Sequence, residues 1–243
     1  MLFRSKKIGK QNQESIEHHQ GLKGEEAKKA AIEMLGKVGI PDPERRYEQY
    51  PHEFSGGMRQ RVVIAIAAAC RPQILICDEP TTALDVTIQA QILQLIRDLQ
   101  KELGMSVIYI THDLGVVANV ADRVAVMYAG QIVETGTADQ VFYNACHPYT
   151  WGLMDAMPNL IQDNKSRLYT IDGAPPDLFN PPTGCAFANR CRFCMAACRK
   201  EEPPVFSCDD GHQAKCWLLD ERAKTVLPEG GLKALRKEEI GNG

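Results

Sequence analysis

Two carboxylates directly follow a short apolar run in residues 74–80, whose sequence is ILICDEP. Phosphoryl transfer needs one carboxylate to hold Mg²⁺ and a second group to polarise the attacking water. Asp78 fits the first role and Glu79 the second. Taken alone, the same residues also describe a buried strand followed by a helix cap, which is the simpler interpretation.

A second group lies upstream, where Ser55, Gly56 and Gly57 precede an apolar helical stretch. Two glycines let a backbone approach a ligand closely, and free N–H groups at a helix start bind phosphate. An ordinary capping turn, with Ser55 as the cap, explains the triplet equally well. Further on, His112 follows the next apolar run, where a histidine can contact a γ-phosphate or can simply be solvated.

The elements around these residues predict an α/β fold with a parallel sheet. Residues 1–24 are polar, show no helical or strand periodicity and are predicted to be mobile. Ligands bind at the C-terminal ends of strands in open α/β sheets, which is where Asp78 and His112 fall. The predicted helices cover residues 25–38, 58–70, 87–103, 114–120, 138–144 and 148–157, and the predicted strands cover 74–78, 106–111, 124–128 and 131–135.

The order of these motifs resembles an ABC-type ATPase. Residues 54–61 (FSGGMRQR) resemble its signature loop, 74–79 its Walker B strand, Asp85 its D-loop and His112 its H-loop. Residues 50–61 (YPHEFSGGMRQR) are similar to the branch that imports peptides and nickel. The segment 147–150 (HPYT) resembles a motif that follows the ATPase core in oligopeptide and dipeptide importer subunits, although a helix opening with proline explains it physically.

The resemblance implies an ATP-hydrolysing subunit of an importer of di- or oligopeptides, with ATP and Mg²⁺ as cofactors. In it, Glu79 polarises water, Asp78 holds Mg²⁺ and His112 contacts the γ-phosphate. The signature-loop residues Ser55, Gly56, Gly57 and Gln60 serve ATP held by a paired ATPase subunit, and Asp85 couples the two sites. Permease subunits and a substrate-binding protein are implied as partners, at the cytoplasmic face of the membrane.

The phosphate-binding P-loop of that family is missing from the 243 residues. The motif needs glycine, four residues, Gly-Lys and then Ser or Thr. Gly9-Lys10 is followed by Gln11, and Gly36-Lys37 by Val38, so neither pair fits. Residues 1–5 (MLFRS) also fit the family poorly. We therefore expect a C-terminal fragment of the subunit, read from truncated DNA, that binds ATP negligibly on its own.

Beyond residue 157 the sequence becomes rich in prolines and cysteines. We expect a partial ATPase domain over 25–157, a small loop-rich domain over 158–227 and a frayed tail over 228–243. Four cysteines, Cys185, Cys191, Cys198 and Cys216, suit either a [4Fe–4S] cluster or tetrahedral zinc. The resemblance and the scarcity of short gaps favour iron–sulfur. Cys194 and Cys208 are additional, a set of Cys191, Cys194 and Cys198 is an alternative, and reduced thiols without metal are the plain interpretation.

The composition of the chain limits which partners and functions are expected. Hydrophobic residues make up 44% of the chain and charged residues 24%, with a net charge of −3, so nothing favours nucleic acid as a partner. The longest apolar run, 62–70, is about half of the roughly 20 residues that a membrane-spanning helix needs. A non-catalytic docking or regulatory module with a metal cluster is the main alternative function, an iron–sulfur electron carrier is a weaker one, and nickel or another small solute is an alternative cargo.

Overall fold

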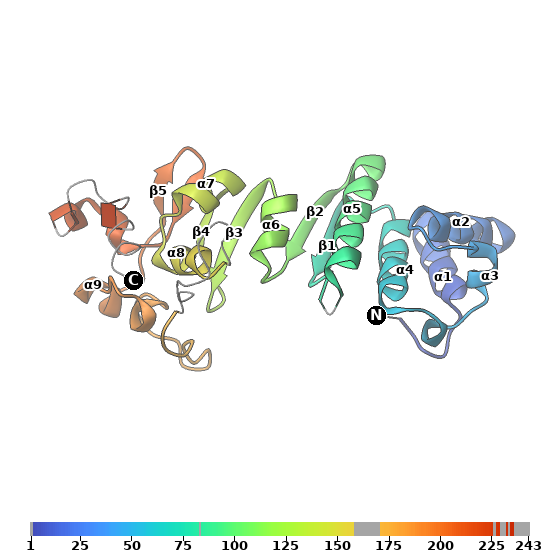
Figure 1. The fold of residues 1–243 in the computed structure, drawn as a ribbon, viewed down its shortest axis with the longest axis horizontal. Coiled ribbons are helices and arrows are strands. Elements are labelled where there is room, and N and C mark those ends of the chain that lie inside the picture. Colours follow the sequence, from blue (N-terminus) through green and yellow to red (C-terminus); the bar gives the residue numbers. More distant parts are fainter. Residues whose placement is uncertain are drawn as a thin grey trace. The chain divides into compact units, whose positions relative to one another are not determined.

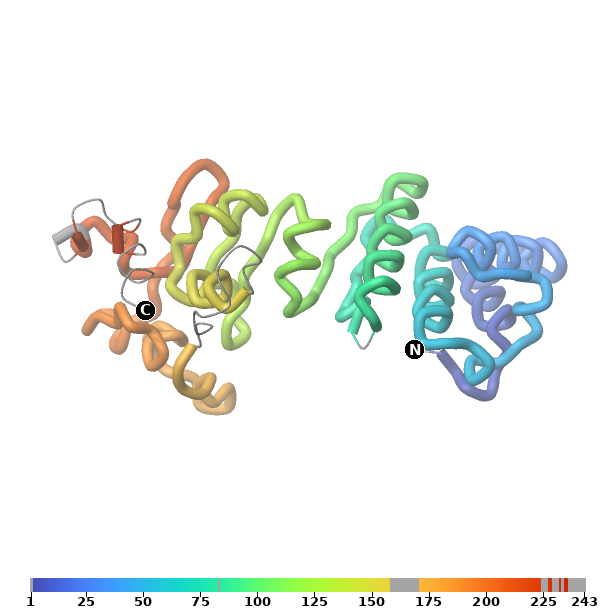
Figure 2. The backbone as a smooth tube through the Cα atoms, in the orientation of Figure 1, coloured from blue at the N-terminus to red at the C-terminus, as the bar shows by residue number. Residues whose placement is uncertain are grey.

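The computed structural model describes residues 2–82, 84–157, 171–225, 227–228, 232 and 234–235. The chain divides into two compact units, residues 1–116 and 117–243. Figures 1 and 2 follow the first unit from blue to green and the second from green to red. The domain boundary predicted near residue 158 lies outside the described residues, whereas the two units divide inside the predicted ATPase domain.

The first unit combines a helical part with a short parallel sheet. Its elements are α1 (Ile8–Gln20), α2 (Gly24–Lys37), α3 (Pro43–Tyr47), the 3₁₀ turn η1 (Pro51–Glu53), α4 (Gly56–Ala69), β1 (Ile74–Asp78), α5 (Val86–Leu103) and β2 (Ser106–Ile110). The helix α6 (Leu114–Val120) begins in this unit and ends in the next. Most of these elements match the predicted ranges to within one or two residues.

The apolar face of the amphipathic helix α5 packs into the main hydrophobic core of this unit. Asp85 caps the helix by accepting a hydrogen bond from Ile88 N at 3.0 Å, and Gly104 ends it at φ 65°. Ile92 and Ile96, one helical turn apart, are fully buried in the same cluster as Val62 of α4. Apolar residues at this spacing form a continuous stripe, which explains why α5 and α4 pack together.

The helix α1 corrects the prediction that residues 1–24 are mobile. Its buried residues include the polar Gln11, Asn12 and Gln13, so the sequence shows no apolar period there. Gln11 bonds the backbone of Phe3 in both directions, at 2.8 and 3.0 Å, and Asn12 Nδ2 donates to Ala31 O at 3.2 Å. These partners satisfy the side chain of Gln11 and the amide nitrogen of Asn12, which would otherwise oppose burial of this face. The Oδ1 atom of Asn12 is buried without a hydrogen-bond partner among the described residues.

The parallel strands β1 and β2 pair in register from Ile74 with Ser106 to Asp78 with Ile110. Leu75 and Cys77 face the core, whereas the opposite face is exposed and apolar. That face is made of Ile74, Ile76, Ile108 and Ile110, which are 56%, 62%, 48% and 50% exposed. Parallel sheets in proteins are normally covered on both faces, so the described part of this unit leaves one sheet face without its usual cover.

The second unit is built on a four-stranded antiparallel sheet in the order β3-β4-β6-β5. The prediction of a mainly parallel sheet is therefore wrong for the described residues, since parallel pairing joins β1 and β2 alone there. Its elements are β3 (Arg123–Tyr128), β4 (Gln131–Thr137), α7 (Ala138–Asn144), α8 (Pro148–Asp155), η2 (Ala188–Arg190), α9 (Ala196–Lys200), β5 (Phe206–Asp209), β6 (His212–Ala214), η3 (Trp217–Leu219) and η4 (Glu221–Thr225).

The hairpin of β3 and β4 turns at Ala129 and Gly130, both with positive φ, as the sequence predicts. The strands β5 and β6 were not predicted, and they place residues 206–214 beside β4. Trp151 of α8 is 1% exposed and anchors a small core with Cys216 and Leu218. None of the described helices combines the length and apolarity needed to cross a lipid bilayer.

Candidate functional site

Glu79 lies immediately after β1 and is held in a left-handed conformation, at φ 47°. Its N–H donates to Ile110 O at 2.8 Å, which ties it to the end of β2. One carboxylate oxygen, Oε2, accepts a hydrogen bond from Thr82 Oγ1 at 2.7 Å, and the other, Oε1, lies 2.8 Å from His112 Nδ1. Parallel pairing thus brings together two of the residues predicted to act on the γ-phosphate side.

These contacts shift the pKa values of both Glu79 and His112. The hydrogen bonds from Thr82 and His112 lower the pKa of Glu79 below its ordinary value of 4.5. The hydrogen bond and charge of Glu79 raise the pKa of His112 above 6.5. The Glu79 contribution to stability is lost as pH falls through its lowered pKa, and that of His112 is lost as pH rises through its raised pKa. Both side chains are therefore charged at pH values between the lowered pKa of Glu79 and the raised pKa of His112.

Replacing Glu79 with Gln should lower the pKa of His112 towards its ordinary value, because the carboxylate that raises it most is removed. An NMR titration of the imidazole signals measures this shift, with His112→Gln assigning the resonance. The variant Thr82→Ala is the matched control, since it removes a Glu79 partner without touching the pair. A wild-type His112 that titrates like a free histidine would contradict the geometry.

The residues predicted to form the signature loop make up a second group, at the start of α4. Ser55 is the N-cap, and its Oγ accepts a weak hydrogen bond from Met58 N at 3.4 Å. Ser55 and Gly56 are exposed, and Gln60 is half-buried. The first N–H groups of a helix have no partner within it, so an exposed N-terminus of this kind can receive an anion.

Glycine is required at this helix start by packing as well. A Cβ on Gly57 would lie 2.8 Å from Ile88 Cγ2, closer than real Cβ contacts allow. A Cβ on Gly56 would lie 3.9 Å from Leu84 Cδ2, an ordinary contact. The predicted D-loop residue Asp85, as the N-cap of α5, thus belongs to a segment that lies directly against the signature loop.

Asp78 and His112 are exposed at the ends of β1 and β2. The neighbouring Asp113, which the sequence analysis did not single out, fixes the segment that carries His112. Its Oδ1 accepts from Gly115 N at 2.9 Å and Val116 N at 3.2 Å, and its Oδ2 accepts from Gln89 Nε2 at 3.0 Å. An Asp followed by a helix start is a cap signal that could have identified it.

The structure also tests whether ATP and Mg²⁺ fit the residues present. Gly9 lies inside α1 against the ring of Tyr47, and Gly36 lies in the last turn of α2. Neither Gly-Lys pair forms the glycine-rich loop before a helix that cradles phosphates. The described residues therefore fit the signature-loop and carboxylate parts of an ATP site but not its phosphate cradle.

In the second unit, the four predicted cysteine ligands line one small cavity. Cys185, Cys191, Cys198 and Cys216 surround it together with Phe187 and Phe193, and its volume is about 10 Å³. Burial raises the pKa of Cys191 to about 12 and raises the pKa of Cys185, Cys198 and Cys216 as well. The thiols are thus held in their neutral form, in a space that fits about one water molecule.

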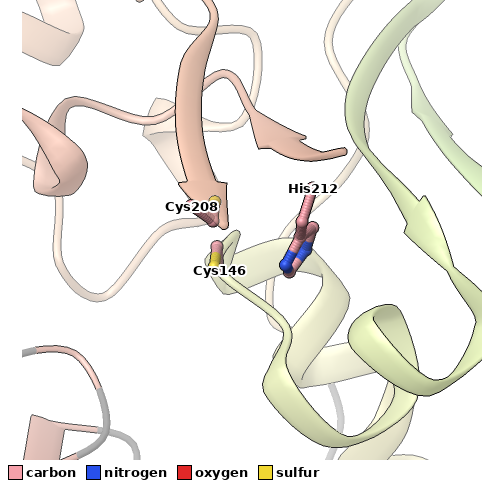
Figure 3. Close-up of side chains that lie close together, drawn as sticks. All are labelled: Cys146, Cys208 and His212. Carbon is pink, nitrogen blue, oxygen red and sulfur yellow. The ribbon is translucent and has the colours of Figure 1, made fainter. Parts of the chain in front are cut away.

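A different set has its ligand atoms close enough to hold a metal ion. Cys146, Cys208 and His212 each offer one ligand atom, and these atoms lie within 4.8 Å of one another (Figure 3). The sequence analysis named Cys208 only as an additional cysteine and missed Cys146 and His212. The spacing Cys208-x₃-His212 was a usable signal, whereas nothing near Cys146 in the sequence pointed to the same cluster.

Comparison with known proteins gives two family-model matches. Residues 2–82 match the ABC transporter model, and residues 133–198 match the model of the oligopeptide/dipeptide transporter C-terminal region. Among curated proteins, the chain is 60% identical to the oligopeptide transport ATP-binding protein OppD of Bacillus subtilis, over 94% of this chain and 64% of the relative. It is 55% identical to the dipeptide transport ATP-binding protein DppD of Lactococcus lactis, over 94% and 65%.

These findings overturn the prediction of an iron–sulfur cluster. The relatives are named as ATP-binding proteins without any mention of such a cluster. Within the described residues, the metal-compatible set is Cys146, Cys208 and His212 and not the predicted four cysteines. The physical basis is distance, since the ligand atoms that lie within 4.8 Å of one another belong to that set.

The chain spans about 64% of the length of the OppD relative, and 67% of the dipeptide transport ATP-binding protein DppD of Bacillus subtilis, to which it is 54% identical. Matches of this strength run through nearly the whole chain and include both units. The chain belongs to the oligopeptide/dipeptide family of ABC transporter ATP-binding proteins.

Proposed function

We propose that this chain contributes the signature-loop and carboxylate parts of an ATPase that energises the uptake of di- or oligopeptides. The observation that carries the proposal is the Glu79–His112 pair at the end of the parallel strands, 2.8 Å apart. The names of the relatives support peptides as the cargo. Nickel or another solute remains the alternative cargo, because the permease and the binding protein select it.

The proposed roles follow from position and chemistry. Asp78 holds Mg²⁺, Glu79 polarises the attacking water and His112 contacts the γ-phosphate, which are the tasks phosphoryl transfer requires. Thr82 and His112 keep Glu79 ionised by lowering its pKa. The left-handed backbone at Glu79 costs energy for a non-glycine residue and is consistent with a functional constraint on its side chain.

The signature loop acts on a different ATP. In ABC ATPase dimers, each ATP lies between the P-loop of one subunit and the signature loop of the other. The exposed start of α4, with Ser55, Gly56, Gly57 and Gln60, is the surface we assign to ATP bound by a paired subunit. Permease subunits at the cytoplasmic face of the membrane and a substrate-binding protein complete the proposed assembly.

A second candidate function is a non-catalytic module that docks on a complete ATPase. The placement of Gly9 and Gly36 within helices favours it, because neither Gly-Lys pair of the described residues forms a phosphate cradle. Both candidates give the same role to the signature loop. They differ in whether Glu79 acts in hydrolysis, which requires a P-loop on the same side of the dimer.

Calorimetric titration with ATP and Mg²⁺ tests the proposal at the level of binding. The isolated chain should show no saturable binding below about 1 mM, because the cradle supplies most phosphate contacts. Mixing it with a P-loop-bearing ATP-binding subunit of the family should tighten ATP binding to that subunit. Micromolar binding by the isolated chain, or no effect in the mixture, would refute the division of roles.

A further inference from the structure

Three candidate metal ligands converge in the second unit from separate parts of the chain. Cys146 lies in the turn between α7 and α8, Cys208 lies in β5, and His212 opens β6. Cys146 and Cys208 are half-buried free cysteines, and His212 is 1% exposed. Figure 3 shows Cys208 on strand β5 and Cys146 on the turn after α7, with both side chains close to the imidazole ring of His212. The cluster is thus formed by tertiary structure.

The β5–β6 hairpin turns two of the ligands to the same side. Phe206 pairs with Ala214 and Asp209 with His212, and a register shift between Ser207 and Asp209 makes Cys208 the bulged residue. A bulge of this kind redirects a side chain. Cys208 and His212 are less exposed than their neighbours Ser207 and Gln213, so both belong to the inner face of the hairpin.

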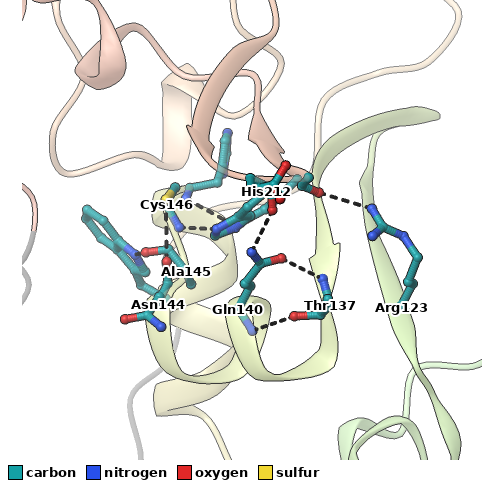
Figure 4. Close-up of polar contacts among 12 residues, drawn as sticks. Arg123, Thr137, Gln140, Asn144, Ala145, Cys146 and His212 are labelled. Atoms are coloured by element: carbon teal, nitrogen blue, oxygen red, sulfur yellow. Dashed lines mark hydrogen bonds and ion pairs between the residues drawn. The ribbon is translucent and has the colours of Figure 1, made fainter.

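The hairpin turn is held from two sides, as Figure 4 shows. Gln140 Nε2 donates to Asp210 O at 2.9 Å, and Arg123 Nη2 donates to Gly211 O at 3.0 Å. Gln140 is itself fixed by a capping box with Thr137, with bonds of 2.9 and 3.2 Å. The loop between Cys208 and His212 is therefore positioned by side chains of β3 and of the start of α7.

A buried carboxylate positions the other part of the cluster. Glu134 of β4 is fully buried, and its Oε1 accepts a hydrogen bond from Cys146 N at 2.7 Å and lies 2.8 Å from His212 Nε2. Its Oε2 accepts from His147 N at 3.1 Å. A histidine that binds a metal commonly gives its second ring nitrogen to a carboxylate, and Glu134 is the carboxylate in that position beside His212.

We propose that Cys146, Cys208 and His212 bind a zinc ion, with Glu134 orienting His212. Two thiolates and one imidazole are ligands that zinc prefers in tetrahedral sites. Bonds of about 2.3 Å to sulfur and 2.1 Å to nitrogen place such ligand atoms about 3–4 Å apart, which is compatible with three ligand atoms that lie within 4.8 Å of one another. Each thiol releases its proton to solvent on binding, and water takes the fourth position.

This zinc site does not depend on the proposed ATPase function, and its test uses metal binding alone. The reduced, metal-free 243-residue chain is titrated with Co²⁺ as a spectroscopic probe, followed by displacement with Zn²⁺. Thiolate-to-cobalt charge-transfer absorbance should appear and should then disappear as zinc replaces cobalt. Cys146→Ser and Cys208→Ser should each weaken binding by more than about tenfold.

Two controls separate this site from the other cysteines. Cys70→Ser changes a half-buried cysteine of the first unit, whose Sγ donates to Ile66 O, and should leave the titration unchanged. Cys191→Ser changes the four-cysteine cavity and should also leave the Cys146-dependent absorbance in place. A wild type that takes up no cobalt overturns the proposal, and so does charge-transfer absorbance in Cys146→Ser and Cys208→Ser that equals the absorbance of the wild type.

A measurement on the wild-type chain tests the zinc site even if a cysteine variant does not fold. Zn²⁺ should protect Cys146 and Cys208 from alkylation, read by peptide mass spectrometry, while Cys70 stays as reactive as before. Equal alkylation of Cys146 and Cys208 with and without zinc, or a disulfide between them under reducing conditions, contradicts the zinc site.

Discussion

Replacing Ser55 with Asp should reduce signature-loop-dependent ATP hydrolysis by about 10²–10³-fold, the cost of losing one donor aimed at transition-state charge. The new carboxylate would stand at the exposed start of α4, where we assign a partner-held γ-phosphate. Repulsion between two anions opposes binding and stabilisation of the transition state there. The rate is measured in a mixture with a P-loop-bearing subunit.

The matched control for this variant is Ser55→Asn. Asp, Asn and Ser cap helices about equally well, so both variants should keep the stability of α4 within about 0.5 kcal/mol. Their difference in rate therefore isolates the negative charge from the loss of the hydroxyl group. Equal rates for Ser55→Asp and wild type would show that no phosphate approaches this helix start.

Replacing Glu134 with Ala should destabilise the second unit by about 3–5 kcal/mol, because each buried donor left without its acceptor costs about 1–3 kcal/mol. The substitution leaves the backbone N–H groups of Cys146 and His147 and the imidazole of His212 without their acceptor. Glu134→Gln keeps the shape and one acceptor oxygen, so it should cost less, about 1–3 kcal/mol.

Urea unfolding followed by tryptophan fluorescence measures this effect, because both tryptophans, Trp151 and Trp217, lie in the second unit. The control is Glu202→Ala, which removes a partner of Lys215 in a surface pair and should change stability by less than about 1 kcal/mol. A Glu134→Ala variant as stable as the control would mean that the carboxylate does not hold this part of the fold.

The contact between Glu79 and His112 could be predicted from the sequence because each residue directly follows its own strand. The apolar run 74–78 forms β1 as expected, and the acid that follows it meets His112 because parallel strands end at the same edge. The signature loop was predictable for a similar reason, since Ser55 both caps and opens one helix. In both cases the residues of the motif directly flank the predicted strand or helix, so predicting the element also places the site.

Elements stabilised by buried polar contacts could not be predicted in the same way. The helix α1 buries Gln11, Asn12 and Gln13, whose partners lie in other segments, so its sequence lacks an apolar period. The strands β5 and β6 are short and depend on pairing with β4.

The cysteine prediction failed because it used spacing along the chain. Cys146 and His212 come together only through Glu134, which contacts both of them from β4. That contact is tertiary, and no spacing in the sequence encodes it. The four predicted cysteines do share a cavity, but the set whose ligand atoms lie within 4.8 Å of one another is a different one.

The central claim is that this chain completes an ATP site whose phosphate cradle belongs to another subunit. The most direct measurement is ATP hydrolysis after mixing the chain with a P-loop-bearing family subunit whose own signature-loop serine has been replaced. We predict that neither protein hydrolyses ATP alone and that the mixture does, saturating at one chain per partner. A mixture no more active than its separate components would contradict the account.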